Sequence, residues 1–205
     1  MKNTATWQQT IERIPDIPVP RIIDSKPLNK GKFLELSEKI IEYPNGMTRH
    51  YEGTSRIETK EIISVLAKTR EDVLILIAEY RPLIAPYWNI SLPAGLVDPG
   101  YNREETCRKE LLEETGYMGE QTQFLINTAP SPGGSNEIIS QYYMPDVVPS
   151  PEGQKLEPSE IIEVLKVPMN EVDMLIKKVM NLTELFVIDA KIAQAMNYAR
   201  LRDYI

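Results

Sequence analysis

One short segment near the middle of the chain constrains the fold more than any other, because both ends of a helix are marked in it. Asn102 is a favourable N-cap residue, and Glu105 three positions later completes a capping box. Gly116 stands where a left-handed residue would end the helix. The sequence therefore predicts a helix over residues 103–115.

Three carboxylates share one face of this predicted helix. Glu110, Glu113 and Glu114 are spaced i, i+3 and i+4, so successive turns bring them together. Each like-charged pair destabilises an isolated helix by roughly 0.2–0.5 kcal/mol, and a bound divalent cation would reverse that repulsion. Leu111 and Cys107 supply the side that can pack on a sheet. Composition alone favours a simpler explanation, a solvated acidic helix face.

A glycine-bounded loop, LPAGLVDPG at residues 92–100, leads directly into the acidic helix. From Gly95 to Tyr117 the sequence is GLVDPGYNREETCRKELLEETGY. This run resembles the signature of the Nudix hydrolases: Gly, five residues, Glu, seven residues, then Arg-Glu-aliphatic-any-Glu-Glu-any-Gly-aliphatic. The matching positions are Gly95, Glu110, Leu111, Glu113, Glu114 and Gly116. A match of this length is far more specific than a short motif.

Four positions depart from the pattern of the family. Tyr101 replaces the first Glu of the signature, and Tyr117 replaces its last aliphatic residue. Lys109 replaces Arg, which keeps the charge but loses the planar fork that donates two hydrogen bonds to one carboxylate. Ser91 stands where relatives often carry Glu before the Pro-Ala-Gly run. These departures leave the fold assignment intact and bear on the rate of catalysis.

Resemblance outside the signature narrows the subgroup. LPAGLVDPG, the run NTAPSPGGSNEIISQYYM and the late FVIDAKIAQA resemble the ADP-ribose pyrophosphatase branch, with Pro132 at a position where that branch has proline. The resemblance extends over about residues 30–200. It implies a metal-dependent hydrolase of the pyrophosphate bond of ADP-ribose or a related nucleoside diphosphate sugar, giving AMP or another nucleoside monophosphate and a sugar phosphate.

The resemblance also implies a metal site. The backbone carbonyl of Ala94, with Glu110 and Glu114, would hold the metal, and Glu113 would support or share it. Oxygen ligands suit Mg²⁺, with Mn²⁺ as the alternative. The cation would bridge pyrophosphate oxygens and lower the pKa of a bound water.

Further residues complete the expected site. The family takes a base or ligand from a loop ahead of a late strand, and Glu160 matches that place best, with Glu157 and Glu163 as rivals. Arg81 corresponds to an arginine near the substrate phosphates, where a planar guanidinium suits the role. Glu137 matches an acid on the substrate side. Each loop glutamate could equally be a solvated carboxylate.

The N-terminal part has a different character from the rest of the chain. Three closely spaced prolines in IPDIPVP predict that residues 1 to about 30 form an extended arm, and residues 32–53 predict a β-hairpin with an Asn-Gly turn. Trp7 resembles the part that stacks on adenine in this branch, although a hydrophobic anchor is equally consistent with it. We expect residues 1–56 to form a dimerisation region of a homodimer and residues 57–205 to form the hydrolase domain.

Hydrophobic patterns predict the remaining elements. Strands are expected in EIISVLAKT, VLILIAEYR, QTQFLINT, IISQYYM and EIIEVLKVP, and helices near residues 170–181 and 188–202. The fold class expected is α+β: a Nudix-type α/β/α sandwich with a mixed sheet, plus the small β-rich N-terminal region.

Composition limits the classes of function. A net charge of −7 argues against a protein that coats nucleic acid or an anionic membrane. A single cysteine excludes an internal disulfide, and a single histidine, His50, argues against a histidine-rich zinc site or a catalytic triad. Without a long apolar run or a secretory signal, the expected location is the cytoplasm.

The departures from the signature keep a second class of function open. A degenerate domain could bind a nucleotide or a protein partner without turnover. Retention of Glu110, Glu113 and Glu114 favours the enzyme. Within the enzyme class, another sugar nucleotide such as UDP-glucose is the main rival substrate, because the same diphosphate is cleaved.

Overall fold

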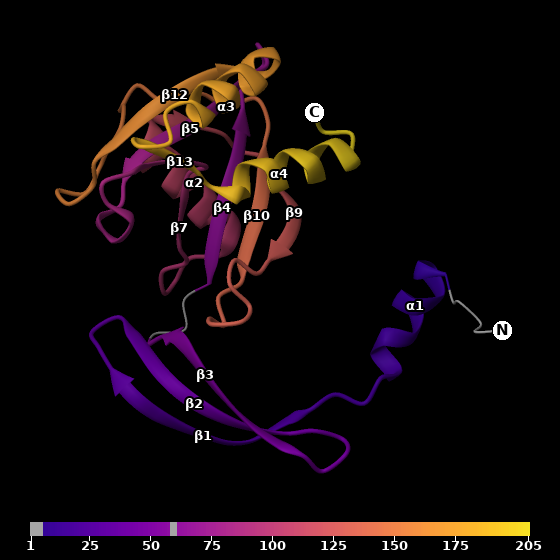
Figure 1. Cartoon of the computed structure of the whole chain (residues 1–205). Coiled ribbons are helices and arrows are strands. Elements are labelled where there is room, and N and C mark those ends of the chain that lie inside the picture. Colours follow the sequence, from indigo (N-terminus) through magenta and orange to yellow (C-terminus); the bar gives the residue numbers. More distant parts are fainter. Residues whose placement is uncertain (1–5, 58–60) are drawn as a thin grey trace. The chain divides into compact units, whose positions relative to one another are not determined.

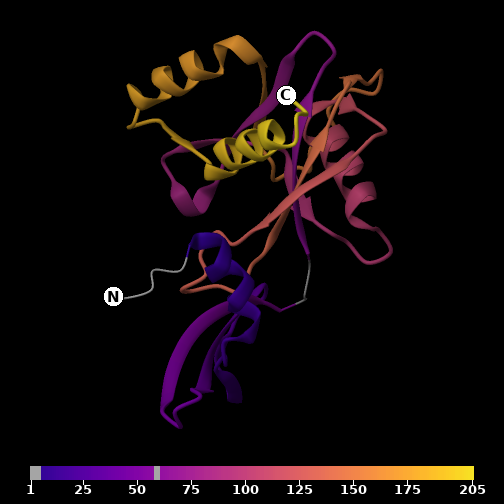
Figure 2. The ribbon, with the colours of Figure 1, turned by 90° about the vertical axis from the view of Figure 1, so that its right-hand side faces the viewer.

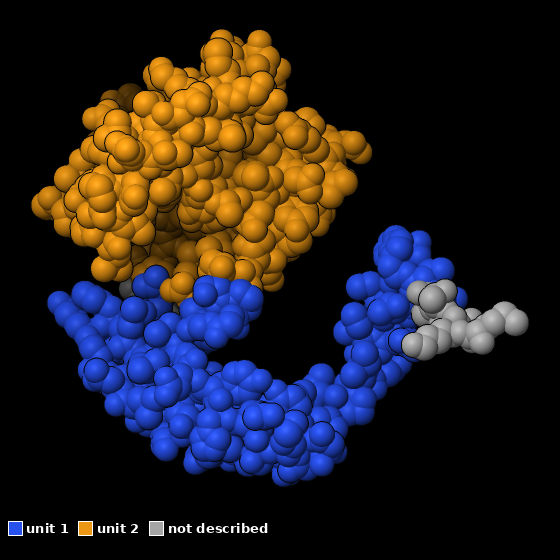
Figure 3. Space-filling view, viewed as in Figure 1, with its two compact units in different colours: residues 1–58, 131–136 blue, residues 59–130, 137–205 orange. Residues whose placement is uncertain are grey.

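The computed structural model describes residues 6–57 and 61–205 and divides into two compact units. The first contains Met1–Glu58 and the loop Ser131–Asn136, and the second contains Thr59–Pro130 and Glu137–Ile205 (Figure 3). The loop that carries SPGGSN therefore groups with the N-terminal strands rather than with the strands that flank it in sequence. Our division into domains at residues 56 and 57 stays a prediction.

The first unit is a three-stranded antiparallel sheet preceded by a short helix (Figure 1). The strand order is β1-β2-β3, and the Asn-Gly turn joins β2 to β3 with Gly46 at φ 82°. The hairpin prediction is confirmed. The elements are α1 (Trp7–Arg13), η1 (Ile14–Asp16), β1 (Arg21–Lys30), β2 (Leu34–Glu42) and β3 (Thr48–Arg56).

The prediction of an extended arm over the first 30 residues is wrong, because α1 and β1 lie within it. Thr6 and Gln9 form a capping box that starts α1 ahead of the first proline. Pro27 lies inside β1, which is an edge strand with a register shift between Pro27 and Asn29. An edge strand tolerates proline because the missing N–H is not needed for pairing on its open side.

The second unit is built on an eight-stranded mixed sheet. Its main path is β13-β6-β5-β4-β10-β9, with β12 added beside β5 and β7 beside β4. Two pairs are parallel, β4 with β10 and β6 with β13. The elements are β4 (Ile62–Lys68), β5 (Val73–Tyr80), η2 (Pro82–Ile84), β6 (Trp88–Ser91), β7 (Ala94–Leu96), α2 (Arg103–Thr115), β8 (Tyr117–Met118), β9 (Gln123–Thr128), β10 (Ile139–Met144), β11 (Val148–Pro149), β12 (Ile162–Pro168), η3 (Met169–Glu171), α3 (Val172–Met180), β13 (Phe186–Ile188) and α4 (Ala190–Leu201).

Helices cover both faces of this sheet (Figure 2). Because side chains alternate along a strand, Leu74 and Leu76 of β5 pack with α3 and α4, whereas Ile75 packs with Cys107 and Leu111 of α2. The α/β/α sandwich with a mixed sheet is confirmed. The alternation also assigns the odd-numbered residues of β5 to the side of α2.

The marked helix forms as predicted, from Arg103 to Thr115. Asn102 and Glu105 make both hydrogen bonds of the capping box, and Gly116 ends the helix at φ 70°. Part of the preceding glycine-bounded loop is a strand, since β7 pairs with β4. In the described part of the chain, none of the helices has the length and apolarity needed to cross a membrane.

Candidate functional site

Two carboxylates of α2 lie against the backbone of β7. The amide N–H of Ala94 donates to Glu114 Oε2 at 3.0 Å, and the Glu114 residue is only 3% exposed. A Cβ atom on Gly95 would lie 2.2 Å from Cδ of Glu110, so glycine is needed for this carboxylate to take its place. The backbone of residues 94–95 therefore holds both side chains that the sequence pairs as metal ligands.

The environment of these carboxylates favours their neutral form when no cation is present. Burial raises the pKa of Glu114 to about 9, with smaller contributions from the charges of Glu110, Glu79 and Glu160. Burial also raises the pKa of Glu110 to about 7. A cation between the two groups would offset the desolvation and the mutual repulsion that cause both shifts.

Lys109 places its ammonium group among the carboxylates beside this pair. Its Nζ is 3.3 Å from Glu113 Oε2, 3.5 Å from Asp98 Oδ2 and 3.8 Å from Glu110 Oε1. Lys109 thus supplies the positive charge that an arginine supplies at this position of the signature. Its ammonium group lies within 4 Å of three carboxylates rather than pairing with one. Glu113 points to Lys109 and is more exposed than Glu114.

A cavity of about 270 Å³ in the second unit brings together Arg81 and the loop glutamates Glu157 and Glu160. Arg81 and Glu160 both line it, although 79 positions separate them in the chain. The cavity is lined by Glu79, Tyr80, Arg81, Pro82, Glu157, Ser159, Glu160, Ile161 and Ile162.

The three rival loop glutamates take different positions. Glu163 pairs with Ala78 in the β12–β5 ladder, and Ala78 belongs to the core beneath α3 and α4, on the face of the sheet opposite α2. Glu157 and Glu160 line the cavity, and Glu160 Oε2 accepts from the amide N–H of Glu157 at 2.9 Å. The charge of Glu160 contributes to the raised pKa of both Glu110 and Glu114. Of the three rivals, Glu160 is thus the one that both lines the cavity and acts electrostatically on the two α2 carboxylates.

Other predicted site residues are not among those that line this cavity. Glu137 is half-buried just before β10 and is absent from the lining of the cavity that Arg81 and Glu160 share. Trp7 begins α1 in the first unit and is 73% exposed. Tyr101 is exposed, and the buried Ser91 donates from Oγ to Asp189 Oδ2 at 3.4 Å.

Two polar residues of the site were missed by sequence analysis. Glu79 is buried at the end of β5 and contacts Arg81, and Asn89 is buried opposite it on β6. The sequence does carry a signal for Glu79, because it is a charged residue near the end of an otherwise apolar strand, two positions before the expected arginine.

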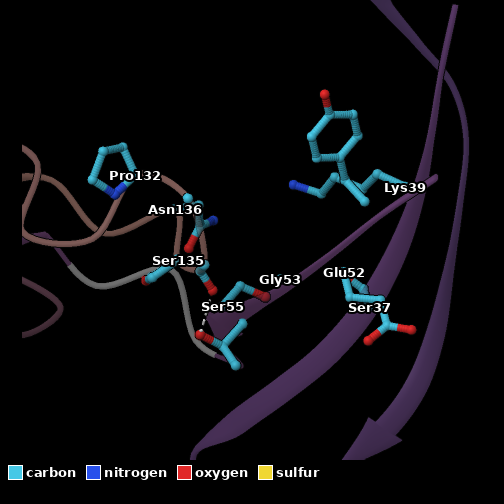
Figure 4. A pocket seen from close by; sticks show the side chains of 12 residues that line it. Ser37, Lys39, Glu52, Gly53, Ser55, Pro132, Ser135 and Asn136 are labelled. Atoms are coloured by element: carbon cyan, nitrogen blue, oxygen red, sulfur yellow. Dashed lines mark hydrogen bonds between the residues drawn. The ribbon is translucent and has the colours of Figure 1, made fainter. Parts of the chain in front are cut away.

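The first unit has a cavity of its own, also about 270 Å³ (Figure 4). Strands β2 and β3 contribute Lys39 and Glu52 among others, and the loop 131–136 contributes Pro132, Ser135 and Asn136. This loop is tied to β3, since Thr54 donates from its amide N–H to the carbonyl oxygen of Gly134 at 2.9 Å. The SPGGSN run is thus the wall of a cavity as well as a turn.

The donors in the second unit fit a hard divalent cation. The groups at the site are carboxylates and backbone oxygens, the ligands that Mg²⁺, Mn²⁺ and Ca²⁺ prefer. Within residues 6–57 and 61–205, no three acidic, histidine or cysteine side chains are already clustered closely enough to hold a metal.

Comparison with known proteins agrees with this geometry. Residues 60–186 match the family model described as NUDIX domain. The chain is 28% identical to the ADP-ribose pyrophosphatase of Bacillus subtilis (strain 168), over 89% of this chain and 94% of the relative. Identity and coverage are the same for the methanol dehydrogenase activator of Bacillus methanolicus. A crystal structure of an ADP compounds hydrolase superimposes with a TM-score of 0.73 at 22% identity, covering 90% of this chain and 94% of that one.

Proposed function

Because this chain belongs to the NUDIX domain family, we propose that it is a hydrolase of the pyrophosphate bond of ADP-ribose or a related nucleoside diphosphate sugar. The products are AMP, or another nucleoside monophosphate, and a sugar phosphate. The relative named ADP-ribose pyrophosphatase, similar over 89% of this chain, supports this substrate class.

One observation carries the proposal. Glu110 and Glu114 lie together on the backbone of residues 94–95, and the charge of Glu160 on the cavity wall is close enough to raise the pKa of both. Arg81 lines that same cavity. Carboxylates for a cation and a guanidinium for phosphate are the groups that a diphosphate needs.

We propose Mg²⁺ as the cation, with Mn²⁺ as a substitute. Glu110, Glu114 and the carbonyl of Ala94 would hold it, and Glu113 would support it through Lys109. When bound, the cation supplies Lewis-acid polarisation and charge neutralisation at the diphosphate.

The side chains of the chain supply the other parts of the reaction. Arg81 donates hydrogen bonds to phosphate oxygens and so fixes the diphosphate in the cavity. Glu160 orients a water molecule towards phosphorus and accepts its proton. Trp7 and Glu137 remain proposed contacts for the nucleoside portion.

The proposed function is tested by determining which bond of ADP-ribose is cleaved. ADP-ribose in ¹⁸O-labelled water is expected to give AMP and ribose 5-phosphate, with the label in one phosphate, because attack occurs at phosphorus. Mass spectrometry of both products checks this, with EDTA as the control that stops turnover. Label at ribose C1, or ADP among the products, would contradict the mechanism. Lack of hydrolysis of a whole nucleotide-sugar panel would favour binding without turnover.

Gly95→Ala is expected to displace the Glu110 carboxylate. The new Cβ would lie 2.2–2.7 Å from Glu110 side-chain atoms, which can rotate away, so the fold should tolerate the change. We expect a loss of turnover of about 10–100-fold, typical of a misplaced catalytic group, with a nearly unchanged melting temperature. Gly133→Ala, where a Cβ meets open space, is the matched control. Parental turnover in the Gly95 variant would show that the position of Glu110 does not matter.

We propose that the first unit forms a homodimer with a second copy of the chain. Among its described residues, Ser37 is the only one that is buried, so the three-stranded sheet lacks an apolar core. A sheet of this size needs a packed face to be stable. Its exposed apolar side chains include Ile11, Ile22, Leu28, Phe33 and Tyr51.

Light scattering at micromolar concentration is expected to give about 47 kDa, twice the 23.4 kDa of the chain. Phe33→Glu, at a position 67% exposed, should shift the mass towards one chain, because a charge in an apolar interface is unpaired. Leu83→Glu, at an exposed position of the second unit, is the control. A mass of 23 kDa for the parental protein would reject the dimer.

A further inference from the structure

Glu79 is a buried carboxylate to which the proposed mechanism assigns no role. It is 6% exposed and follows five buried residues of β5. Arg81 comes two residues later in extended backbone, so both side chains leave the chain on the same side. This is the side of α2, because Ile75 of the same odd-numbered series packs there.

Each oxygen of Glu79 has its own partner. Oε2 lies 2.7 Å from Nε of Arg81, and Oε1 accepts from Nδ2 of Asn89 at 3.0 Å. Asn89 stands directly across the β5–β6 ladder from Glu79. The carboxylate is therefore fixed by a neighbouring strand before it contacts the arginine.

This contact leaves the phosphate-binding end of the arginine available. Glu79 engages Nε, and within the described residues no partner is found for the two terminal nitrogens of Arg81. The Arg81 side chain is 57% exposed, and both residues line the cavity shared with Glu160. An exposed arginine samples many rotamers, and a ligand must order it on binding unless another group has already done so.

The position of Glu79 also bears on the absent acid at Ser91. Ser91 pairs with Ile77 in the ladder, one step along the same face from the pair of Asn89 with Glu79. The carboxylate that this chain lacks at position 91 is thus present nearby, on the adjacent strand. A buried charge at position 79 is unfavourable unless it is paired.

We propose that Glu79, held by Asn89, is a positioning residue that fixes Arg81 so that both terminal nitrogens of the guanidinium bind the diphosphate. The proposal rests on the proposed function, because that function gives Arg81 its diphosphate ligand. Glu79 acts through Arg81 and does not touch the substrate itself.

A double-mutant cycle tests the proposal by direct binding. Calorimetry with ADP-ribose in EDTA, where no turnover occurs, would compare Glu79→Gln, Arg81→Gln and the double variant with the parental protein. We expect Glu79→Gln to raise Kd about 10-fold, and to add less than 2-fold in the Arg81→Gln background. Asn89→Ala should raise Kd by a smaller factor in the parental background only. Ser140→Ala removes a part-buried hydrogen bond to Asn127 elsewhere in the sheet and should leave Kd unchanged.

Two further measurements distinguish a positioning role of Glu79 from a role as a metal ligand. The NMR order parameter of the Arg81 Nε–H group should be higher in the parental protein than in Glu79→Gln, because the ion pair restricts the side chain. Equal effects of Glu79→Gln in both arginine backgrounds would overturn the proposal, and so would equal order parameters in the two proteins. A 10-fold loss of Mn²⁺ affinity in Glu79→Gln would instead identify Glu79 as a metal ligand. If ADP-ribose fails to bind, the cycle is run with inorganic pyrophosphate. Non-additivity there, together with absent hydrolysis, would uphold the positioning role while the proposed function fails.

Discussion

Replacing Glu114 by glutamine is expected to lower kcat for ADP-ribose by on the order of 100-fold or more while the protein stays folded. A lost metal contact worth roughly 3 kcal/mol corresponds to a factor of about 100 in rate. Glutamine keeps the shape of the side chain and can still accept the Ala94 N–H bond through its carbonyl oxygen. It cannot supply the negative charge that a cation requires.

The same substitution should leave the metal-free protein equally stable or more stable at pH 7. Burial raises the pKa of Glu114 to about 9, so the folded protein holds it protonated at pH 7, whereas the unfolded chain ionises it. That ionisation favours unfolding, and glutamine removes it. We expect an equal or higher melting temperature in EDTA, and a smaller rise than the parental protein when Mg²⁺ is added.

Glu104→Gln provides the matched control, since it makes the same change on an exposed position of α2. It should change neither turnover nor the response to Mg²⁺. Turnover by Glu114→Gln at the parental rate would show that Glu114 is not a ligand. Loss of folding in Glu114→Gln would show that the carboxylate serves stability instead.

The parts of the fold that depend on local signals could be predicted from sequence. The bounds of α2 follow from a capping box at Asn102 and a left-handed glycine at position 116, both of which act within one turn of the helix. The alternation of β5 and the Asn-Gly turn are equally local. The first strand was missed because the three prolines of IPDIPVP indicate an extended arm up to about residue 30, and only the pairing with β2 shows that residues 21–30 form an edge strand.

The candidate site also has a part that sequence spacing predicts and a part that depends on how distant strands pair. Helical spacing brings Glu110 and Glu114 together whatever the rest of the chain does. The partnership of Glu79 with Asn89 needs the register of β5 against β6, which sequence spacing does not specify. The choice among the loop glutamates also depends on register, since pairing with Ala78 puts Glu163 on the opposite face from α2.

Hydrogen bonds join the C-terminal end of α2, the acidic helix, to the loop that leads to Glu160. The carbonyl of Gly116 accepts from the amide N–H of Ser150 at 2.8 Å. The side-chain amide of Gln154 donates to the carbonyl of Glu114 at 2.6 Å, and the backbone amide of Lys155 donates to the carbonyl of Glu113 at 2.9 Å. A change at position 116 should therefore affect both stability and the approach of Glu160.

Gly116→Ala is expected to destabilise the protein by about 2–5 kcal/mol. A left-handed backbone at φ 70° costs a non-glycine residue roughly 1–2 kcal/mol, and forcing atoms into packed space adds about 1–3 kcal/mol. The new Cβ would lie 2.8 Å from the backbone nitrogen of Gln154 and 2.9 Å from the carbonyl carbon of Gly153. Backbone atoms cannot rotate away as a side chain can, so the loop itself must shift.

Gly153→Ala separates the backbone strain from the steric clash, the two contributions to the loss of stability expected in Gly116→Ala. Gly153 has a similar φ of 67°, but a Cβ there meets nothing within 4 Å, so the variant has the backbone strain without the clash. Urea denaturation should therefore show a loss of about 1–2 kcal/mol for Gly153→Ala and a distinctly larger loss for Gly116→Ala. Turnover measured where both variants are fully folded should fall only in Gly116→Ala, because only that variant moves the loop ahead of Glu160. Equal losses of stability in the two variants would mean that the loop yields freely, and its contacts with α2 would then not hold Glu160 in place.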